Sequence, residues 1–215
     1  MATLDFSLER TSDPSVEPLS LSEVRNHVGI VGDHDNDRLS DLIQAAREQF
    51  EIDTGLALIN QTWVQRLDRP PWFGTNHNFI DLLDDQLFHT RSSGIGRNVR
   101  LLRRPVSSLT SVTYLDLNGD SQTWSSSEYE LDEKRVAPVV WLAYNQSWPS
   151  TRAIQNALTF TFVAGYGAAA SDVPELIRQA LLLQISAWYE NRCMGPNEAA
   201  SYEAVVERYA WAGYP

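Results

Sequence analysis

The pattern of apolar and polar residues predicts two helices near the start of the chain. Ser20 and Glu23 are spaced as in a capping box, in which each residue satisfies a free backbone N–H of the first helical turn. Gly29 ends this helix or lies just inside its end. A second helix is predicted over about residues 38–54, with Gly55 as its stop, because apolar residues recur there at helical spacing. The two apolar faces comprise Leu21, Val24 and Val28, then Leu39, Leu42, Ile43, Ala46 and Phe50.

From residue 57 the pattern changes to short β-branched and aromatic runs separated by turn residues, which predict an antiparallel β module up to residue 165. Asn118-Gly119 lies between two of these runs and is the strongest hairpin signal in the chain. Residues 69–98 form a long segment rich in Pro, Gly, Asn and Ser around one short apolar run. Segments of this length between strands are uncommon unless they have a function. The composition fits both a contact loop and a disordered loop.

Helices resume near Val173. Asp172 is the predicted N-cap, and Pro174 is tolerated in the first turn because its missing N–H has no helical partner. Gly195-Pro196 ends this helix, and a last amphipathic helix follows. We expect the first of these helices to be buried on most sides, because its apolar face is broad: Val173, Leu176, Ile177, Ala180, Leu181, Ile185 and Trp188, widened by Leu182 and Leu183. The last helix has Tyr202, Val205, Val206, Tyr209 and Ala210 on one face.

These elements predict an α+β protein. A helical bundle of two N-terminal and two C-terminal helices would carry an inserted antiparallel β module. The helical domain is predicted to comprise residues 19–56 and 172–215, and the β module residues 57–171 with the long loop 69–98. Residues 1–18 contain two prolines and no sustained period, so we expect a flexible N-terminal arm there.

The composition is that of a globular protein, with 43% hydrophobic and 21% charged residues. The formal net charge of −11 argues against binding nucleic acid through phosphate neutralisation, but it suits a surface past which DNA slides. The single cysteine, Cys193, forms no internal disulfide and indicates a reducing compartment. No apolar run is long enough to span a membrane and the first residues lack a secretory pattern, so we expect a protein made in the cytoplasm.

The stretch TFVAGYG, residues 161–167, raises the question of a nucleotide site. Gly165, Gly167 and Ala170 fit the relaxed dinucleotide-binding pattern G-x-G-x-x-A. A phosphate-binding turn needs its helix to begin at the glycines, whereas the predicted cap lies at Asp172, whose carboxylate would repel a phosphate. We therefore interpret Gly165 and Gly167 as an elbow between a strand and a helix. The hypothesis of a nucleotide-dependent enzyme has only this pattern as its support.

The sequence predicts no catalytic residue, no metal and no cofactor. Three aspartates alternate as at the start of an EF-hand loop, but Arg38 occupies the position that needs glycine, and Gln44 that of the bidentate glutamate. Asp35 or Asp37 is better explained as a helix cap than as a calcium ligand. The histidines show no metal-binding spacing: they are His27, His34, His77 and His89.

Seven Trp and eight Tyr are many for 215 residues, and several lie at predicted ends and turns. Trp and Tyr are the usual anchors of protein–protein interfaces, so we expect the C-terminal stretch YAWAGYP to form one. The tryptophans expected in the core are Trp63, Trp141 and Trp188.

Three groups of segments occur in a recognisable order. The first is LSLSEVRNHVGI, an acidic turn and RLSDLIQAAREQFEIDTGLALINQTW; the second is RPVSSLTSVTYLDLNGDSQTW; the third is SWPSTRAIQNALTFTFVAGYG with VPELIRQALLLQISAWYENR. This series, over residues 19–192, resembles the head–tail connector (adaptor) proteins of tailed bacteriophages. The segments are similar to the family's opening helices and first strand, its Pro-led hairpin, and its closing strand, glycine elbow and long helix.

The resemblance implies a structural virion protein without enzymatic activity. Such adaptors form a twelve-subunit ring between the portal and the next tail component, in the neck of a particle assembled in the bacterial cytoplasm. Genomic DNA passes through the ring without specific binding. The resemblance also implies that residues 198–215 reach the portal, with Tyr202, Tyr209, Trp211 and Tyr214 as docking residues. The candidates for contact with a neighbouring subunit or the tail are Trp72, Phe73 and Phe88.

The residues also support an alternative, a β-rich module that binds a ligand such as a carbohydrate. Exposed tryptophans would be its stacking platforms, and the candidates are Trp72, Trp124 and Trp148. The two hypotheses differ in whether the aromatic side chains meet a sugar or another protein.

Overall fold

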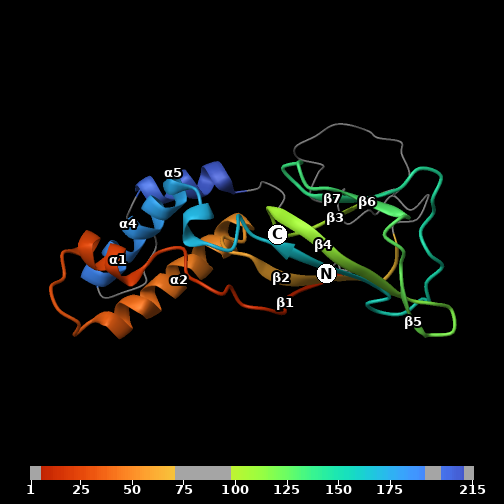
Figure 1. Ribbon diagram of the computed structural model, residues 1–215, viewed down its shortest axis with the longest axis horizontal. Helices are drawn as coiled ribbons and strands as arrows, with labels where there is room; N and C mark the ends of the chain where they lie inside the picture. Colours follow the sequence, from red (N-terminus) through yellow and green to blue (C-terminus); the bar gives the residue numbers. More distant parts are fainter. Residues whose placement is uncertain (1–5, 71–97, 192–199, 211–215) are drawn as a thin grey trace, which may run out of the picture. The chain divides into compact units, whose positions relative to one another are not determined.

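The computed structural model describes residues 6–70, 98–191 and 200–210 (Figure 1). The described chain divides into two compact units. One contains helices and comprises residues 14–60, 165–191 and 200–210; the other contains strands and comprises residues 6–13, 61–70 and 98–164. We call them the helical unit and the β unit. The predicted α+β class is confirmed.

The helical unit contains four α-helices and one short 3₁₀ turn among its described residues: α1 (Leu21–Val28), α2 (Asn36–Thr54), η1 (Ala170–Asp172), α4 (Glu175–Asn191) and α5 (Ala200–Tyr209). The capping box at α1 is confirmed, because Ser20 N donates to the Glu23 carboxylate at 2.8 Å and Glu23 N donates to Ser20 Oγ at 3.2 Å. Gly29 and Gly55 end α1 and α2 in the left-handed conformation, at φ +77° and +69°.

Two predicted aspartate caps act differently from the prediction. The Asp172 carboxylate accepts a hydrogen bond from Ala169 N at 2.9 Å. It therefore caps the start of η1 instead of the start of α4. Asp35 occupies the N-cap position of α2 but makes no capping hydrogen bond through its side chain. Its carboxylate instead accepts from the Tyr189 hydroxyl at the far end of α4. Each carboxylate thus accepts from a donor other than the helix N–H that a cap would satisfy.

The core of the helical unit forms from the inward faces of its helices. The Phe50 ring of α2 packs edge-on against the Tyr202 ring of α5, with centroids 6.0 Å apart. Most of the predicted face of α4 is buried, but Leu176 and Leu183 remain 41% and 39% exposed. The broad burial expected for α4 is therefore found, because α1, α2 and α5 all pack against it, and the exception is the side that carries Leu176 and Leu183. The largest buried residues of this core are Leu39, Phe50, Leu56, Leu58, Ile59, Ile177, Leu181 and Tyr202.

The β unit contains two antiparallel sheets. The first has the order β1-β2-β8-β4-β5, from strands Phe6–Arg10, Gln61–Leu67, Leu158–Ala164, Val106–Leu115 and Ser121–Thr123. The second has the order β3-β7-β6, from strands Asn98–Arg100, Val139–Leu142 and Tyr129–Asp132. Buried Gln65 of β2 links the first sheet to the chain around β3, because its amide donates to Arg100 O and accepts from Leu102 N, each at 2.9 Å. The predicted antiparallel β structure is confirmed.

The predicted Asn-Gly hairpin is confirmed between β4 and β5. The Asp116 carboxylate accepts from Asn118 N at 2.9 Å and from Asp120 N at 3.0 Å, and Gly119 has φ +94°. These hydrogen bonds, the one from Asp120 foremost, lower the pKa of Asp116. The carboxylate thus supplies acceptors to backbone N–H groups that the two strands leave unpaired.

The prediction of a flexible N-terminal arm is wrong for residues 6–10, because these residues form β1. This strand pairs with β2 along its whole length, from Phe6 opposite Leu67 to Arg10 opposite Trp63. Beyond it, Thr62 N donates to Ser12 Oγ at 2.9 Å. The backbone hydrogen bonds of β1 come from a partner more than fifty residues away, so the five-residue strand gives little periodic signal of its own. Residues 1–5 lie outside the described part of the chain.

Within the described residues, no helix is both long and apolar enough to cross a membrane.

The burial of Tyr202 leads to a stability prediction. Tyr202 is completely buried, burial foremost raises the pKa of its hydroxyl, and that hydroxyl donates to Asp53 at 3.3 Å. We expect Tyr202→Ala to lower the free energy of unfolding by about 3–5 kcal/mol, because it leaves a cavity in the core. Tyr202→Phe, the matched control, keeps the ring and should cost only about 1 kcal/mol. Urea unfolding measures both, and equal effects would contradict a packing role for the ring.

Candidate functional site

Two backbone segments that are distant in sequence meet inside the helical unit. Tyr166 N donates to Leu58 O at 3.2 Å, and Asn60 N donates to Gly167 O at 2.9 Å. We call residues 56–60 and 165–167 the junction. It lies where the chain leaves the helical unit after α2 and where it returns before α4. The junction therefore joins the N-terminal and C-terminal parts of that unit through backbone hydrogen bonds.

The two glycines of the predicted elbow are required by close contacts at the junction. Gly165 has φ +150°, and a Cβ atom there would lie 2.4 Å from Asn60 N. A Cβ atom on Gly167 would lie 2.1 Å from the Asp172 carboxylate. Because a carboxylate fills the space beside Gly167 and would repel a phosphate, the local chemistry opposes the nucleotide interpretation. The glycines allow two segments to approach each other closely.

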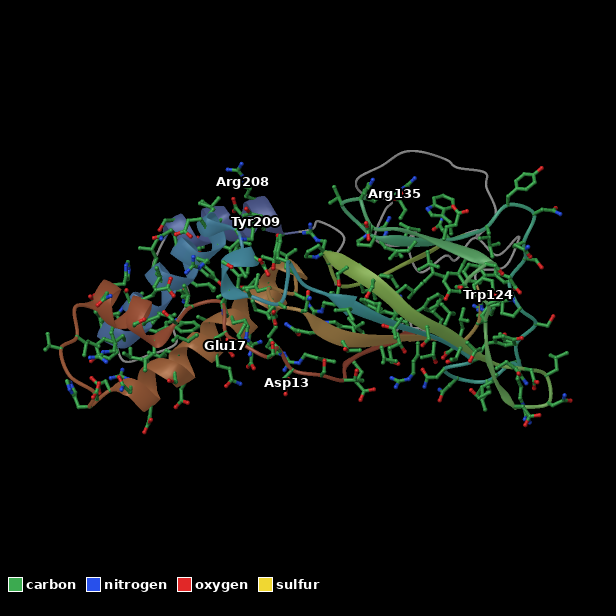
Figure 2. The ribbon with its side chains drawn as sticks, viewed as in Figure 1. Asp13, Glu17, Trp124, Arg135, Arg208 and Tyr209 are labelled. Atoms are coloured by element: carbon green, nitrogen blue, oxygen red, sulfur yellow. The ribbon has the colours of Figure 1, made fainter. Side chains whose placement is uncertain are left out.

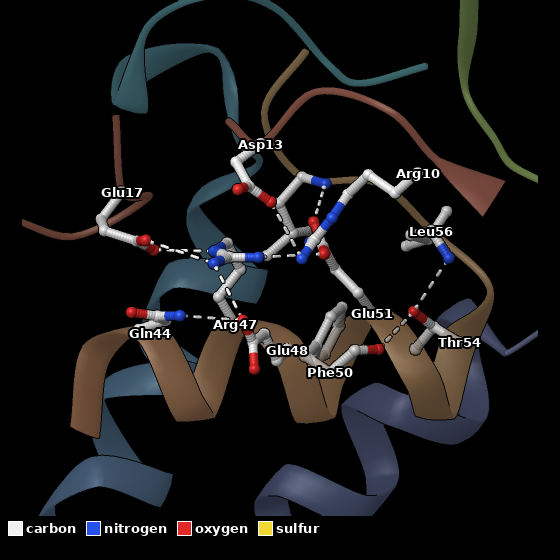
Figure 3. A network of polar contacts seen from close by, with 11 residues as sticks. Arg10, Asp13, Glu17, Gln44, Arg47, Glu48, Phe50, Glu51, Thr54 and Leu56 are labelled. Atoms are coloured by element: carbon white, nitrogen blue, oxygen red, sulfur yellow. Dashed lines mark hydrogen bonds and ion pairs between the residues drawn. The ribbon is translucent and has the colours of Figure 1, made fainter. Parts of the chain in front are cut away.

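A buried arginine network supports the junction from α2 (Figure 3). The Arg47 side chain is 3% exposed and contacts three carboxylates, those of Glu17 at 2.8 Å, Glu51 at 3.2 Å and Glu48 at 3.5 Å. The other Glu51 oxygen accepts from Leu58 N at 2.8 Å. Glu51 therefore connects Arg47 directly to the junction.

The charge balance around Arg47 is favourable despite its burial. Burial alone lowers the pKa of Arg47, but the hydrogen bond and charge of Glu17, followed by the charges of Glu51 and Glu48, raise it above the ordinary value. Sequence reasoning missed this network. Arg47 and Glu51 are four residues apart, a spacing that usually indicates an exposed helical ion pair, and Glu17 is thirty residues earlier in the chain.

The predicted docking residues differ in their surroundings. Tyr202 is buried in the core, so its predicted role as a docking residue is wrong: its ring cannot reach another protein while α5 is folded. Tyr209 lies at the end of α5 and is partly buried against the same core (Figure 2). The remaining predicted contact residues lie outside the described chain: Trp72, Phe73, Phe88, Trp211 and Tyr214.

The tryptophans of the β unit do not form exposed stacking platforms. Trp124 is only 4% exposed, and its ring lies 5.1 Å from the rings of both Tyr129 and Trp148, measured between centroids. Its indole N–H donates to the Glu128 carboxylate. The expectation that Trp124 is an exposed platform is therefore wrong. Trp63 and Trp188 are buried as predicted, while Trp141 is only partly buried and lies under the Arg135 guanidinium, 5.1 Å from its ring centroid.

Asp33, the first of the alternating aspartates that resemble the start of an EF-hand loop, binds side chains of the protein itself. Asp33 accepts from the Arg25 guanidinium at 2.9 Å and from the Asn36 amide at 3.3 Å. Over the ranges that the structure describes, no group of three His, Cys, Asp or Glu side chains is placed to hold a metal ion.

A groove of about 400 Å³ lies between α1 and the first half of α4. Arg178 lines it and donates to Glu175 at 3.0 Å, to Pro18 O at 3.3 Å and to the Glu23 carboxylate. The groove combines apolar side chains with acidic and amide side chains: Leu19, Glu23, Asn26, His27, Glu175, Arg178, Gln179 and Leu182. It is thus suited to an amphipathic side chain of another molecule.

The negative charge is concentrated in the helical unit. Its two sequence segments, residues 14–60 and 165–211, hold 15 acidic and 6 basic residues, a formal charge of −9. The remaining chain holds 13 acidic and 11 basic residues, a formal charge of −2. The groove therefore belongs to the strongly acidic part of the molecule.

Comparisons with known proteins agree with the sequence resemblance. Residues 18–78 match the family model for phage gp6-like head-tail connector proteins, which confirms the resemblance over that part of the chain. A search of curated protein sequences finds no match.

Solved structures of gene transfer agent (GTA) particles contain chains with a similar fold. A chain from the neck of an empty GTA particle, computed with C6 symmetry, gives a TM-score of 0.74 at 20% identity, covering 97% of this chain and 100% of that one. A chain from the neck of a native GTA particle, computed with C12 symmetry, gives a TM-score of 0.72 at 20% identity, covering 97% of this chain and 100% of that one. A chain from the native GTA virion gives a TM-score of 0.71 at 22% identity, covering 97% of this chain and 99% of that one.

The junction leads to a prediction about its tightest glycine. We expect Gly165→Ala to prevent stable folding, because the new methyl group would meet the backbone of Asn60 and the residue would also keep an unfavourable φ. Gly29→Ala is the matched control, since Gly29 has φ +77° with nothing within 4 Å of the added Cβ, and it should cost only about 1–2 kcal/mol. Thermal unfolding followed by circular dichroism compares them. Similar losses would show that the close approach at Gly165 is unimportant.

The arginine network leads to a second prediction. Arg47→Ala removes the guanidinium that pairs with buried Glu51, so we expect it to lower the free energy of unfolding by about 3–5 kcal/mol. Arg25→Ala is the control, because the Arg25–Asp33 pair is largely exposed and should contribute no more than about 1 kcal/mol. Urea unfolding of both variants gives the comparison, and a loss for Arg47→Ala as small as that for Arg25→Ala would contradict the proposed importance of the network.

Proposed function

We propose that this chain is a head–tail adaptor, a structural protein that forms a ring between the portal and the tail of a tailed phage or phage-like particle. One observation carries the proposal: 97% of the chain matches the full length of a chain from a GTA neck, with a TM-score of 0.74. The match of residues 18–78 to the connector family supports it independently. In this function the protein is a virion component, with no enzymatic activity and no cofactor.

The two-unit organisation suits a ring subunit. Every contact in a closed ring joins two different faces of the subunit, because the same face cannot contact itself around the ring. We infer that a bundle of four helices supplies one kind of surface and the inserted β module the other. The neck computed with C12 symmetry is consistent with twelve subunits.

The charge suits a conduit for DNA. A formal net charge of −11 provides no general attraction for phosphates, so genomic DNA would pass through the lumen without being held. The partners in this proposal are the portal protein, the next tail or neck component and further copies of the chain. The ring would be added in the host bacterial cytoplasm and remain at the neck of the virion.

Within this function, the C-terminal aromatics Tyr209, Trp211 and Tyr214 are the proposed portal contacts. Trp72, Phe73 and Phe88 stay a prediction for contact with a neighbour or the tail. Gly165 and Gly167 are proposed to act as the elbow between the strands and the C-terminal helices. The carbohydrate-binding alternative receives no support from the comparisons, and buried Trp124 argues against it.

The portal contact can be tested with the double variant Trp211→Ala/Tyr214→Ala. Deleting residues 198–215 would be a poorer test because it removes α5 with buried Tyr202. One interface anchor contributes about 2 kcal/mol or more, so we expect binding to the portal of the same particle to weaken at least about 30-fold. Biolayer interferometry on immobilised portal measures this.

The control for this experiment is Val31→Ala, which changes an apolar side chain that is 91% exposed in the helical unit. Its affinity should equal that of the unchanged chain. If the double variant binds as tightly as the control, the C-terminal docking assignment is wrong. If the unchanged chain does not bind the portal at all, the adaptor function is wrong.

A further inference from the structure

One aromatic side chain of the β unit is almost completely exposed. Tyr144 is 94% exposed, at the tip of a turn that follows β7. The turn has a defined shape, because Gln146 N donates to Ala143 O at 3.1 Å and Asn145 adopts φ +60°. At its base, Ala143 N donates to Glu128 O at 3.0 Å, and Trp148 packs against Trp124. A well-supported turn therefore presents Tyr144 to solvent.

The sequence around this turn lacks negative charge. Residues 134–171 contain no Asp or Glu, although the chain has 28 in total. The charged residues of this stretch are all basic: Lys134, Arg135 and Arg152. Residues 144–148, YNQSW, combine two aromatics with uncharged hydrogen-bonding side chains. Tyr, Ser and Asn are common in contact loops, because Tyr is a rigid anchor and the polar side chains adapt to a partner. The turn itself thus brings no carboxylate to an acidic surface, and the nearby Glu128 carboxylate at its base accepts a hydrogen bond from the Trp124 indole.

The groove in the helical unit has the complementary chemistry. Leu19 and Leu182 give it an apolar part, and the carboxylates of Glu23 and Glu175, to which Arg178 also donates, give it acceptors. A tyrosine fits such a site, because its ring needs apolar contact and its hydroxyl needs a hydrogen-bond partner. Leu176 and Leu183, seven residues apart on one side of α4, add partly exposed apolar surface on the same helix. The groove volume of about 400 Å³ is ample for one aromatic side chain.

We propose that the Tyr144 turn of one subunit inserts into the groove between α1 and α4 of the next copy. This inference rests on the proposed ring function. A second copy is the occupant that the charges favour, because a carboxylate-free turn meets a unit with a formal charge of −9. The contact joins two different surfaces, so it can repeat around a ring.

Cysteine cross-linking tests the contact directly. Tyr144→Cys and Asn26→Cys place one thiol on the turn and one on an exposed groove residue, in a background where Cys193→Ser removes the only native thiol. A short bis-maleimide reagent is then added to the purified full chain. We expect the double variant to form a ladder of covalent multimers. Each single variant alone should remain monomeric on a denaturing gel, and a mixture of the two should stop at dimers.

The negative outcomes distinguish a failure of the Tyr144 contact from a failure of the proposed adaptor function. Native mass spectrometry, with and without the portal, shows whether non-covalent rings form. Rings without a covalent ladder would overturn the Tyr144 contact and leave the adaptor function intact. A double variant that stops at dimers would show a contact that does not propagate, and would also overturn it. A chain that forms no ring under either condition would overturn both.

A substitution series gives a second readout. We expect Tyr144→Ala to weaken association between subunits at least about 30-fold, as loss of an interface anchor would, while its thermal unfolding stays unchanged. Leu117→Ala is the matched control, because Leu117 is a 69% exposed apolar residue of the same unit at a different turn. Equal association constants for the two variants, measured by sedimentation, would contradict the proposal.

Discussion

The helical unit depends on hydrogen bonds that meet at Leu58. Its N–H donates to buried Glu51, and its carbonyl oxygen accepts from Tyr166 N. Glu51 in turn pairs with Arg47, whose side chain is almost fully buried. Buried ion pairs contribute little net stability, since desolvation offsets most of the attraction, but breaking one is costly. We infer that this pair fixes the register in which residues 56–60 meet residues 165–167.

This constraint explains which features the sequence predicts well. The ends of α1 and α2 follow from Ser20, Glu23, Gly29 and Gly55, because caps depend on neighbours only a few residues away. The β4–β5 hairpin follows from Asn118-Gly119 for the same reason. Features that depend on partners distant in sequence were not predictable. The strand β1 forms by pairing with β2, and buried Arg47 is balanced by the carboxylate of Glu17.

The docking residues show the same limit more sharply. Tyr202 and Tyr209 lie seven residues apart on α5 and share one apolar face, so periodicity alone treats them alike. The fold buries Tyr202 completely against Phe50 and leaves Tyr209 partly exposed at the helix end. Conversely, no periodic pattern marks Tyr144, whose exposure depends on the turn that carries it. Which aromatics are available to partners is a property of the fold, and the sequence supplies only their positions.

The proposed function requires this chain to form a ring at the neck of a particle, next to the portal. Electron microscopy of the purified chain mixed with the portal of the same particle tests this claim most directly. We expect closed rings stacked coaxially on the portal, with the symmetry axis along the DNA channel. Portals without added density, beside free monomers of the chain at saturating concentration, would contradict it.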